Sequence, residues 1–269
     1  MRLLFFYLNI ILILILPNYL LFSQQIATPI QPEIGPAQQE IGLIVGLGSN
    51  IQSGIFKTEC PCDFDNGKRF GYLFGIFYEN DITRHIQWGI SGIYDNKGVT
   101  ASYLEREATP VISQTTGKTE NVRLLWRHKA EADFSFITAM PFIKWMPANF
   151  FFIKLGIGAS YIVGNNVKHS KELLENTVLL STGELVKVEV PNSNNNNLVV
   201  QDSKFPQINS FQLSIDPIIG FNIPFNNYFY ISPAFHYSFP LNTIINDGDF
   251  KISSLHFWVE FKVPIRLRK

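Results

Sequence analysis

The last stretch of the chain alternates strictly between apolar and polar positions. From Leu255 to Leu267 every second residue is apolar, and the residues between them include His256, Glu260 and Lys262. Successive side chains of a β-strand point to opposite faces, so this period of two predicts a strand with one apolar and one polar face. In a soluble sandwich the apolar face lies in a core, whereas in a transmembrane barrel it meets lipid and the polar face lines the interior. One strand cannot decide between the two.

Seven earlier segments repeat this alternation. Each has an apolar set at every second position, and in most of them the other set is rich in Gly, Ser or charged residues. With the closing stretch, the segments are 41–50, 70–79, 86–94, 131–142, 151–163, 211–222, 228–239 and 255–267. Their lengths are close to the ~9–11 residues that a tilted strand needs to cross a bilayer.

The facing of these segments follows from their apolar sets. In 131–142 we expect Phe134, Phe136, Met140 and Phe142 to face lipid and Glu131 and Asp133 to face the interior. In 70–79 both sets are apolar, so the facing stays open. Pro217, Pro233 and Pro264 lie inside strands and lack an N–H donor, which predicts bulges there.

The connections between the segments alternate in length. The short ones are 79–84, 145–149 and 223–227, and the long ones are 52–69, 96–129, 165–208 and 240–253. Outer-membrane barrels have short periplasmic turns, long outer loops and an even number of strands. The pattern therefore predicts an all-β fold, an eight-stranded antiparallel up-and-down transmembrane β-barrel over residues 40–269. In the third long connection, Val186, Val188 and Val190 alternate with polar residues, which predicts a hairpin.

Composition agrees with this fold. The net charge is zero, so the charge balance does not indicate nucleic-acid binding. Only 16% of the residues are charged, and 14% are aromatic. After the N-terminal stretch, no apolar run approaches the ~20 residues of a spanning helix. A secreted soluble barrel or sandwich is the alternative.

The N-terminal residues have the pattern of an export signal. Arg2 precedes a long apolar stretch that ends near Ser23, and Pro17 and Asn18 interrupt it, which favours a cleaved signal over an anchor. We expect residues 1–23 to be a signal peptide and the Pro- and Gln-rich residues 24–39 to be a flexible lead-in.

The strand and turn order, the closing strand and the stretch CPCDFDNGKRFGYLFGIFYE resemble small outer-membrane barrels. The stretch reads as a first outer loop and a second strand with glycine-spaced aromatic residues, namely Gly71, Tyr72, Phe74, Gly75, Phe77 and Tyr78. Residues 40–267 thus resemble the OmpX/OmpA/PorT-like group of eight-stranded barrels. The resemblance implies a location in the cell outer membrane, with outer-membrane lipid and the barrel assembly machinery as partners. The chain departs from the group in ending on RLRK rather than on an aromatic residue.

The chain has two cysteines, Cys60 and Cys62. In an oxidising, exported setting this spacing favours a local disulfide, with free thiols as the alternative. A zinc site would need more ligands, and no histidine lies near in sequence.

Charged residues in the polar sets have two interpretations. They could form an ion or proton path, or a paired plug, because an eight-stranded barrel has just enough room for side chains. Buried charges must be paired. We therefore expect Lys154, Asp216, Glu260 and Lys262 to form one paired network in the interior.

Catalytic signatures are weak. His128 with Glu131, and His169 with Glu172, are candidate pairs at the barrel rim, but no nucleophile motif accompanies them. Phosphate-binding loops and zinc motifs are absent from the sequence. We expect no enzyme and no cofactor or metal, and a structural or surface-binding role in which the long loops bind an extracellular ligand. A rim enzyme is the alternative.

Overall fold

The computed structural model describes residues 39–58, 62–83, 85–148, 150–188, 196–205, 207–226, 229–246 and 248–265. They all belong to one compact unit, Pro36–Lys269. None of these residues forms a helix that is long and apolar enough to cross a membrane. The expected signal peptide, 1–23, and the lead-in, 24–39, except for its last residue, lie outside the described residues.

The described residues form fifteen strands, and all of their pairings are antiparallel, which confirms the all-β antiparallel prediction. The strands are β1 (Gln39–Ser53), β2 (Phe56–Lys57), β3 (Asp63–Phe64), β4 (Lys68–Thr83), β5 (Ile86–Asn96), β6 (Val99–Ile112), β7 (Thr119–Ala148), β8 (Phe151–Leu173), β9 (Thr177–Leu179), β10 (Leu185–Lys187), β11 (Asn197–Ser203), β12 (Phe211–Phe221), β13 (Ile223–Asn226), β14 (Phe229–Pro240) and β15 (Lys251–Pro264).

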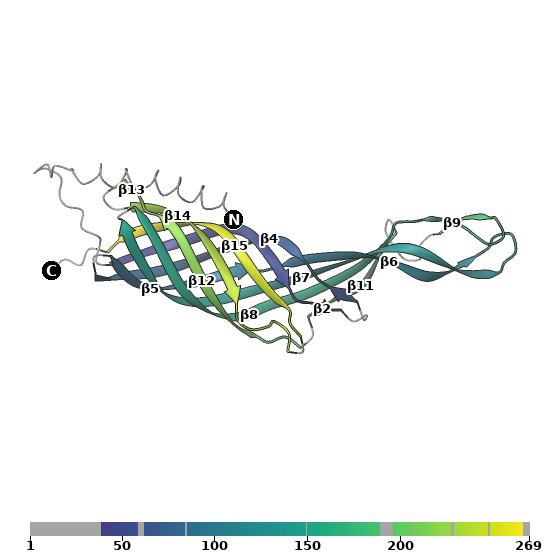
Figure 1. Cartoon of the computed structure of the whole chain (residues 1–269), viewed down its shortest axis with the longest axis horizontal. Helices are drawn as coiled ribbons and strands as arrows, with labels where there is room; N and C mark the ends of the chain where they lie inside the picture. The colour runs from purple at the N-terminus through teal and green to yellow at the C-terminus, as the bar shows by residue number, and fades with distance from the viewer. Residues whose placement is uncertain are drawn as a thin grey trace, which may run out of the picture. The chain divides into compact units, whose positions relative to one another are not determined.

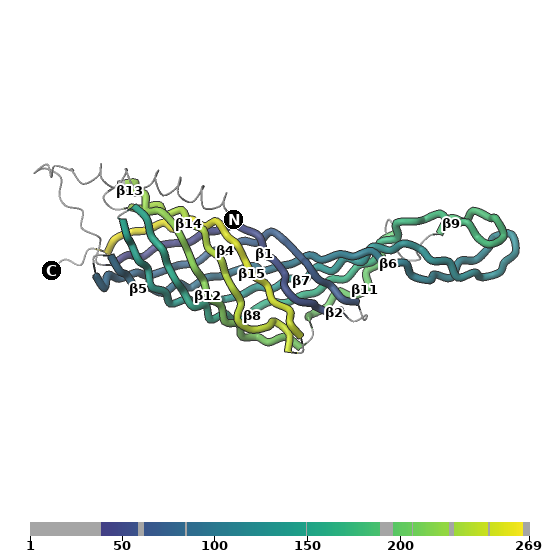
Figure 2. The backbone as a smooth tube through the Cα atoms, viewed as in Figure 1, coloured from purple at the N-terminus to yellow at the C-terminus, as the bar shows by residue number. Residues whose placement is uncertain are grey.

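Eight of the strands form a closed circuit. The pairing runs from β1 through β4, β5, β7, β8, β12, β14 and β15, and β15 pairs with β1 again (Figure 1). The first and last strands therefore lie side by side, with Glu40 opposite Pro264 (Figure 2). We call this end of the circuit the terminal end and the opposite end the loop end. The structure has more strands than the sequence predicted because the connections contain strands of their own.

Two strands run on past the circuit at its loop end. β7 has 30 residues and β8 has 23, and their far halves pair with β6 and β11 in the order β6–β7–β8–β11 (Figure 1). We call this four-stranded part the extension sheet. Most of the expected loop 96–129 is thus a long hairpin, and 165–208 contains the rest of β8, the hairpin β9–β10 and β11.

Side-chain facing confirms the sequence pattern in most of the circuit. On β15, Phe257 is exposed on the outside, whereas Trp258 and Glu260 are buried inside. In β7 the predicted facing is wrong: Phe134, Phe136, Met140 and Phe142 point inward, and Glu131 and Asp133 lie on the outer face.

Glycines explain the reversed facing of β7. A Cβ atom on Gly89 would collide with the Phe142 ring, and one on Gly156 would lie 2.7 Å from Met140 Cγ. Large residues on β7 thus fill space that glycines on its two neighbours leave open, so apolar side chains occupy the interior as well as the outside.

A register shift changes the facing of β8. The pairing of β7 with β8 steps by one residue between Ser135 and Phe136. Below the step Phe152 and Lys154 point inward, and beyond it Val167 and His169 do. A one-residue step moves every following side chain to the other face of the strand.

The strand prolines do not produce the expected bulges. Pro217 lies opposite Leu155 and Pro233 opposite Val259, both without a shift in register. Because proline only removes a donor, the ladder can continue past it.

Candidate functional site

The outer face of the circuit is an apolar band to which all eight strands contribute exposed side chains. Its large residues are Ile41, Leu43, Val45, Leu47, Phe70, Tyr72, Phe74, Ile76, Ile86, Trp88, Ile90, Ile137, Ile143, Trp145, Leu155, Ile157, Tyr161, Val163, Phe211, Leu213, Ile215, Ile219, Phe221, Phe235, Tyr237, Phe239, Leu255, Phe257 and Val263. Soluble monomers rarely expose apolar patches of more than a few hundred Å². A surface of this kind is suited to an apolar surrounding.

The interior near the terminal end holds a buried charge cluster of Glu40, Glu79, Lys144, Lys154, Glu260 and Lys262. Glu79 is its centre: its two carboxylate oxygens accept hydrogen bonds from Lys144 Nζ, at 2.7 Å, and from Lys154 Nζ. Lys154 also donates to Glu260 at 2.6 Å, and Lys262 lies 2.9 Å from the other Glu260 oxygen. Three acids thus balance three lysines.

Aromatic rings surround the three ammonium groups. Lys154 Nζ lies 4.7 Å from the centre of the Phe142 ring, and Lys262 Nζ lies 4.8 Å from that of Phe152. Cation–π contacts add attraction where water is excluded. The cluster is therefore a packed ionic core.

Of the four residues that the sequence placed in one network, the structure brings Lys154, Glu260 and Lys262 together. Asp216 lies elsewhere: His236 Nε2 is 3.0 Å from its Oδ1, and Ser214 donates to its Oδ2 at 2.6 Å. The reason is the register, because Ile218 lies opposite Lys154 and Asp216 lies two residues farther from the terminal end.

A histidine layer surrounds Asp216. The His236 ring stacks on Trp258, with centroids 4.6 Å apart, and on His256 at 5.8 Å. Asp95 lies 3.5 Å from Lys97, and Lys97 donates to Ser238. On β15, Trp258 separates this layer from the charge cluster, so the polar groups of the interior form two separate layers.

Sequence reasoning missed Glu79 and Lys144. Glu79 is both the last residue of the predicted segment 70–79, whose facing is open, and the first of the short connection 79–84, whereas β4 continues to Thr83. A signal is present, because Glu79 continues the inward set of Leu73 and Phe77, and Lys144 continues that of Phe142. The alternation of segment 131–142 has to be extended by two residues to include Lys144.

The interior is closed at the loop end by an aromatic cap, which consists of Phe56, Phe64, Phe134, Phe205 and Phe250. The rings of Phe56 and Phe64, from the β2–β3 hairpin, stack with centroids 5.4 Å apart, and Phe250 lies 5.0 Å from Phe56. The connections between the circuit strands thus supply four of the five rings that lie over this end of the circuit.

The sequence matches no protein-family model and no curated protein. Among solved structures, it is similar to the attachment invasion locus protein Ail of Yersinia pestis, at 11% identity and a TM-score of 0.35, over 84% of this chain and 99% of Ail. It is also similar to Neisserial surface protein A, at 8% identity and a TM-score of 0.34, over 84% and 97% of the two chains. A third match is the outer membrane protease OmpT of Escherichia coli, at 9% identity and a TM-score of 0.31, over 84% and 96%.

These neighbours are small outer-membrane β-barrel proteins, the group that the sequence resembles. They include a protease as well as proteins that are not named as enzymes. At TM-scores below 0.5 they add no argument about this chain, so its own strand pairing and burial carry the interpretation.

The histidine–carboxylate pairs considered from sequence do not form. Glu131 pairs with Lys129 and Glu172 with Arg127, both on the outer face of the extension sheet. His128 and His169 point to its inner face and are fully buried. Burial lowers the pKa of His169 to about 4 and also lowers the pKa of His128, so both rings are neutral near pH 7.

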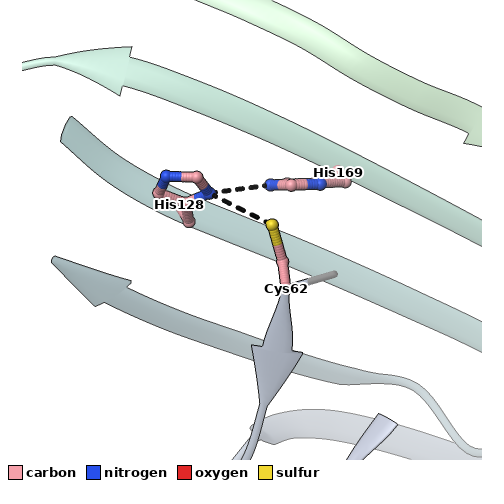
Figure 3. A group of neighbouring side chains, drawn as sticks. All are labelled: Cys62, His128 and His169. Carbon is pink, nitrogen blue, oxygen red and sulfur yellow. Dashed lines mark hydrogen bonds between the residues drawn. The ribbon is translucent and has the colours of Figure 1, made fainter. Parts of the chain in front are cut away.

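Cys62 belongs to a disulfide. Cys60 lies outside the described residues, so its pairing with Cys62 stays a prediction. The Cys62 Sγ atom lies 3.9 Å from His128 Nδ1, beneath the extension sheet (Figure 3).

Proposed function

We propose that this chain is an outer-membrane protein whose eight-stranded circuit is a transmembrane β-barrel with a plugged interior. The observation that carries this proposal is the inversion of the circuit: its outer face is an apolar band, and its interior buries Glu79, Lys144 and Lys154. Bacterial outer-membrane barrels have this arrangement, with apolar residues toward lipid and polar residues inside. A soluble sandwich would place the two sets the other way round.

The proposed orientation places the terminal end in the periplasm and the extension sheet outside the cell. Its support is the asymmetry of the connections: β4 and β5 are joined by two residues at the terminal end, whereas every long connection lies at the loop end. Outer-membrane barrels keep their long loops outside.

We further propose that the barrel does not conduct ions and that it serves a structural or surface-binding role. The charge cluster and the aromatic cap both support a plugged interior, since each fills part of the interior with buried side chains. The extension sheet and the β9–β10 hairpin at its tip are the proposed binding surface, because they are built from paired strands and the hairpin carries exposed Leu179 and Leu185 opposite each other. Outer-membrane lipid and the barrel assembly machinery are further proposed partners.

A catalytic role at the rim is not proposed. A hydrolytic site needs its histidine and nucleophile open to substrate. His128 and His169 are fully buried, and Thr58, the hydroxyl that contacts His169, is 8% exposed.

Epitope insertion tests the membrane topology. One tag is placed at Gly117 or Gly183, which have open space around them, and another in the turn between β4 and β5. Antibody should label the tag at Gly117 or Gly183 on intact cells and the tag in the β4–β5 turn only after the outer membrane is opened. Labelling of the β4–β5 tag on intact cells, or recovery of the folded protein as a soluble molecule, would refute the proposal.

Two measurements test the plug and the surface role. The purified protein in a planar lipid bilayer should show no steady conductance. The barrel should also stay closed when the Glu79 carboxylate is removed. A photoreactive residue at Leu185 should cross-link to a discrete partner on intact cells, whereas one at Leu104, also exposed but far from the tip, should not. Equal cross-linking at Leu185 and Leu104 would mean that the tip does not bind a specific partner.

A further inference from the structure

A compact group of ligand atoms lies beneath the extension sheet, outside the interior layers described above. His128 on β7 and His169 on β8 extend from neighbouring strands, and their Nδ1 and Nε2 atoms are 3.2 Å apart (Figure 3). Cys62 approaches from the opposite side, and the ligand atoms of the three residues lie within 4.8 Å of one another. Three metal-binding side chains thus converge on one point.

The spacing of these atoms fits one tetrahedral metal ion. With metal–nitrogen bonds of ~2.0–2.1 Å and a metal–sulfur bond of ~2.3 Å, tetrahedral angles put two nitrogens about 3.3 Å apart and nitrogen and sulfur about 3.6 Å apart. The observed separations are 3.2 Å between the nitrogens and 3.9 Å between His128 Nδ1 and Cys62 Sγ. A small shift of Cys62 toward His128 would bring the second separation to its tetrahedral value, and the third, between His169 and Cys62, lies within 4.8 Å.

An oxygen atom lies close to the other ring nitrogen of each histidine. His128 Nε2 lies 2.8 Å from Glu107 Oε1, and His169 Nδ1 lies 3.1 Å from Thr58 Oγ1. Such outer contacts orient metal-bound histidines and raise their basicity. Tyr103 stacks on the His128 ring at 4.7 Å and fixes its plane.

The oxidation state of Cys62 controls the third ligand, because a disulfide sulfur is a poor ligand and a thiolate a good one. We propose that His128 and His169 form a site for a borderline transition metal such as Zn²⁺, and that Cys62 joins them once a thiol has reduced its disulfide. Two molecules of the thiol give two electrons and two protons to the disulfide and leave as their own disulfide. The Cys62 thiol then loses its proton to solvent when the metal binds.

Soft and borderline metals are the expected occupants. Two imidazoles and a thiolate are the ligands that Zn²⁺ prefers over Mg²⁺ or Ca²⁺, which take oxygen ligands. The proposal does not depend on the membrane topology, so its failure would leave the proposed function untouched.

Cobalt(II) is a suitable probe, because a cobalt–thiolate bond gives a charge-transfer absorption band. The full chain in detergent is reduced, freed of the reductant and titrated with Co²⁺. We expect one ion per chain with tetrahedral d–d bands and a sulfur charge-transfer band. The disulfide form should lack the charge-transfer band and bind at least tenfold more weakly.

Variants assign the ligands. His128→Ala and His169→Ala should each weaken binding by more than tenfold, and Cys62→Ser should abolish the charge-transfer band while retaining weak binding. Glu107→Gln should weaken binding about 10-fold to 100-fold, as loss of an outer contact does. His85→Ala is the matched control, since His85 lies in the turn between β4 and β5 and contacts Met146 instead. It should bind as the wild type does.

A measurement on the unaltered protein removes dependence on variant folding. Zn²⁺ should slow the alkylation of reduced Cys62, followed at that residue by mass spectrometry. Unchanged alkylation, or cobalt binding without a sulfur band in the reduced protein, would overturn the proposal.

Discussion

The two halves of β7 continue one strand with one facing, but their outer faces have opposite compositions. Beyond Ser135, toward the tip, the outer face carries charge at five positions, Arg123, Arg127, Lys129, Glu131 and Asp133. In the circuit the same face carries Ile137, Ala139, Pro141, Ile143 and Trp145. The inner face is largely apolar in both halves, with Ala130, Ala132 and Phe134 beyond the step and Met140 and Phe142 in the circuit. The two halves therefore differ in their outer faces, and this difference is the one that the proposed membrane topology requires, with water around the extension sheet and lipid around the circuit.

The charge pairs of the two regions differ in the same way. In Arg127–Glu172, on the extension sheet, both side chains are nearly half exposed, at 46% and 44%. In Lys144–Glu79, inside the circuit, the values are 1% and 0%. An exposed pair is screened by water, whereas a buried one loses its hydration and depends on its partners.

Removal of the Glu79 carboxylate should give the largest difference in unfolding free energy between a buried and an exposed charge pair. Glu79→Ala leaves Lys144 and Lys154 without their shared partner, which should cost about 3–5 kcal/mol of unfolding free energy. Glu172→Ala, on the extension sheet, should cost at most about 1 kcal/mol. Urea titration of the protein folded in lipid vesicles measures both, and equal costs would mean that the interior is hydrated.

Removing both partners of a buried pair sharpens the same test. Glu260→Gln alone should destabilise the protein more than Glu260→Gln with Lys262→Met, because the double change leaves no lone charge. Additive losses in a double-mutant cycle would contradict the ionic core.

An arginine placed on the outer face should give the next largest difference in stability between the circuit and the extension sheet. Ile143 on β7 and Leu104 on β6 have the same exposure, 58%. Ile143→Arg should cost about 2–4 kcal/mol, because it puts a charge into lipid, and Leu104→Arg should change stability by less than about 0.5 kcal/mol. Folding titrations in vesicles compare them. Similar costs for the two substitutions would mean that the apolar band does not lie in lipid.

Filling a glycine space tests the packing of the interior. A Cβ on Gly89 would meet the Phe142 ring, whereas one on Gly92, on the outer face of the same strand, has its nearest neighbour at 3.9 Å. Gly89→Ala should destabilise by about 1–3 kcal/mol through overpacking, and Gly92→Ala should be nearly neutral. A neutral Gly89→Ala, in the same titration, would indicate a loosely packed interior.

The smallest effect is expected at an exposed charge. Lys129 lowers the pKa of Glu131 on the outer face of the extension sheet by hydrogen bonding to its carboxylate. Because the folded-state pKa is depressed, the pair stabilises the fold above the ordinary pKa of Glu131, and this is lost as the pH falls through the lowered value. Glu131→Gln should cost less than about 1 kcal/mol at pH 7, and the cost should shrink as the pH falls through the lowered pKa. A cost that stays the same at every pH would exclude the ion pair as its cause.

The sequence pattern predicts the strands and most of their facing because burial and exposure alternate with the period of a strand. It fails for β7, where Phe142 and Met140 are interior because glycines on other strands leave room for them. It gives no facing past the step in β8, where the sequence predicts a long connection, and a register shift is a property of two strands that cannot be seen in one. For the same reason the pairing of His128 with His169 has no sequence signal: the residues are 41 positions apart.

Closure of the circuit by β1 and β15 has a consequence for how the chain folds. Glu40 and Pro264 lie at opposite ends of the described sequence, so the final contact joins the most distant segments. Such non-local pairing is slow, because the chain loses the entropy of loop closure before any favourable contact forms to compensate for it. Until closure, β1 and β15 each present an unpaired edge that can template aggregation. The nascent chain therefore needs protection until its last strand has arrived, and a truncation that removes β15 should yield aggregates in place of a smaller folded protein.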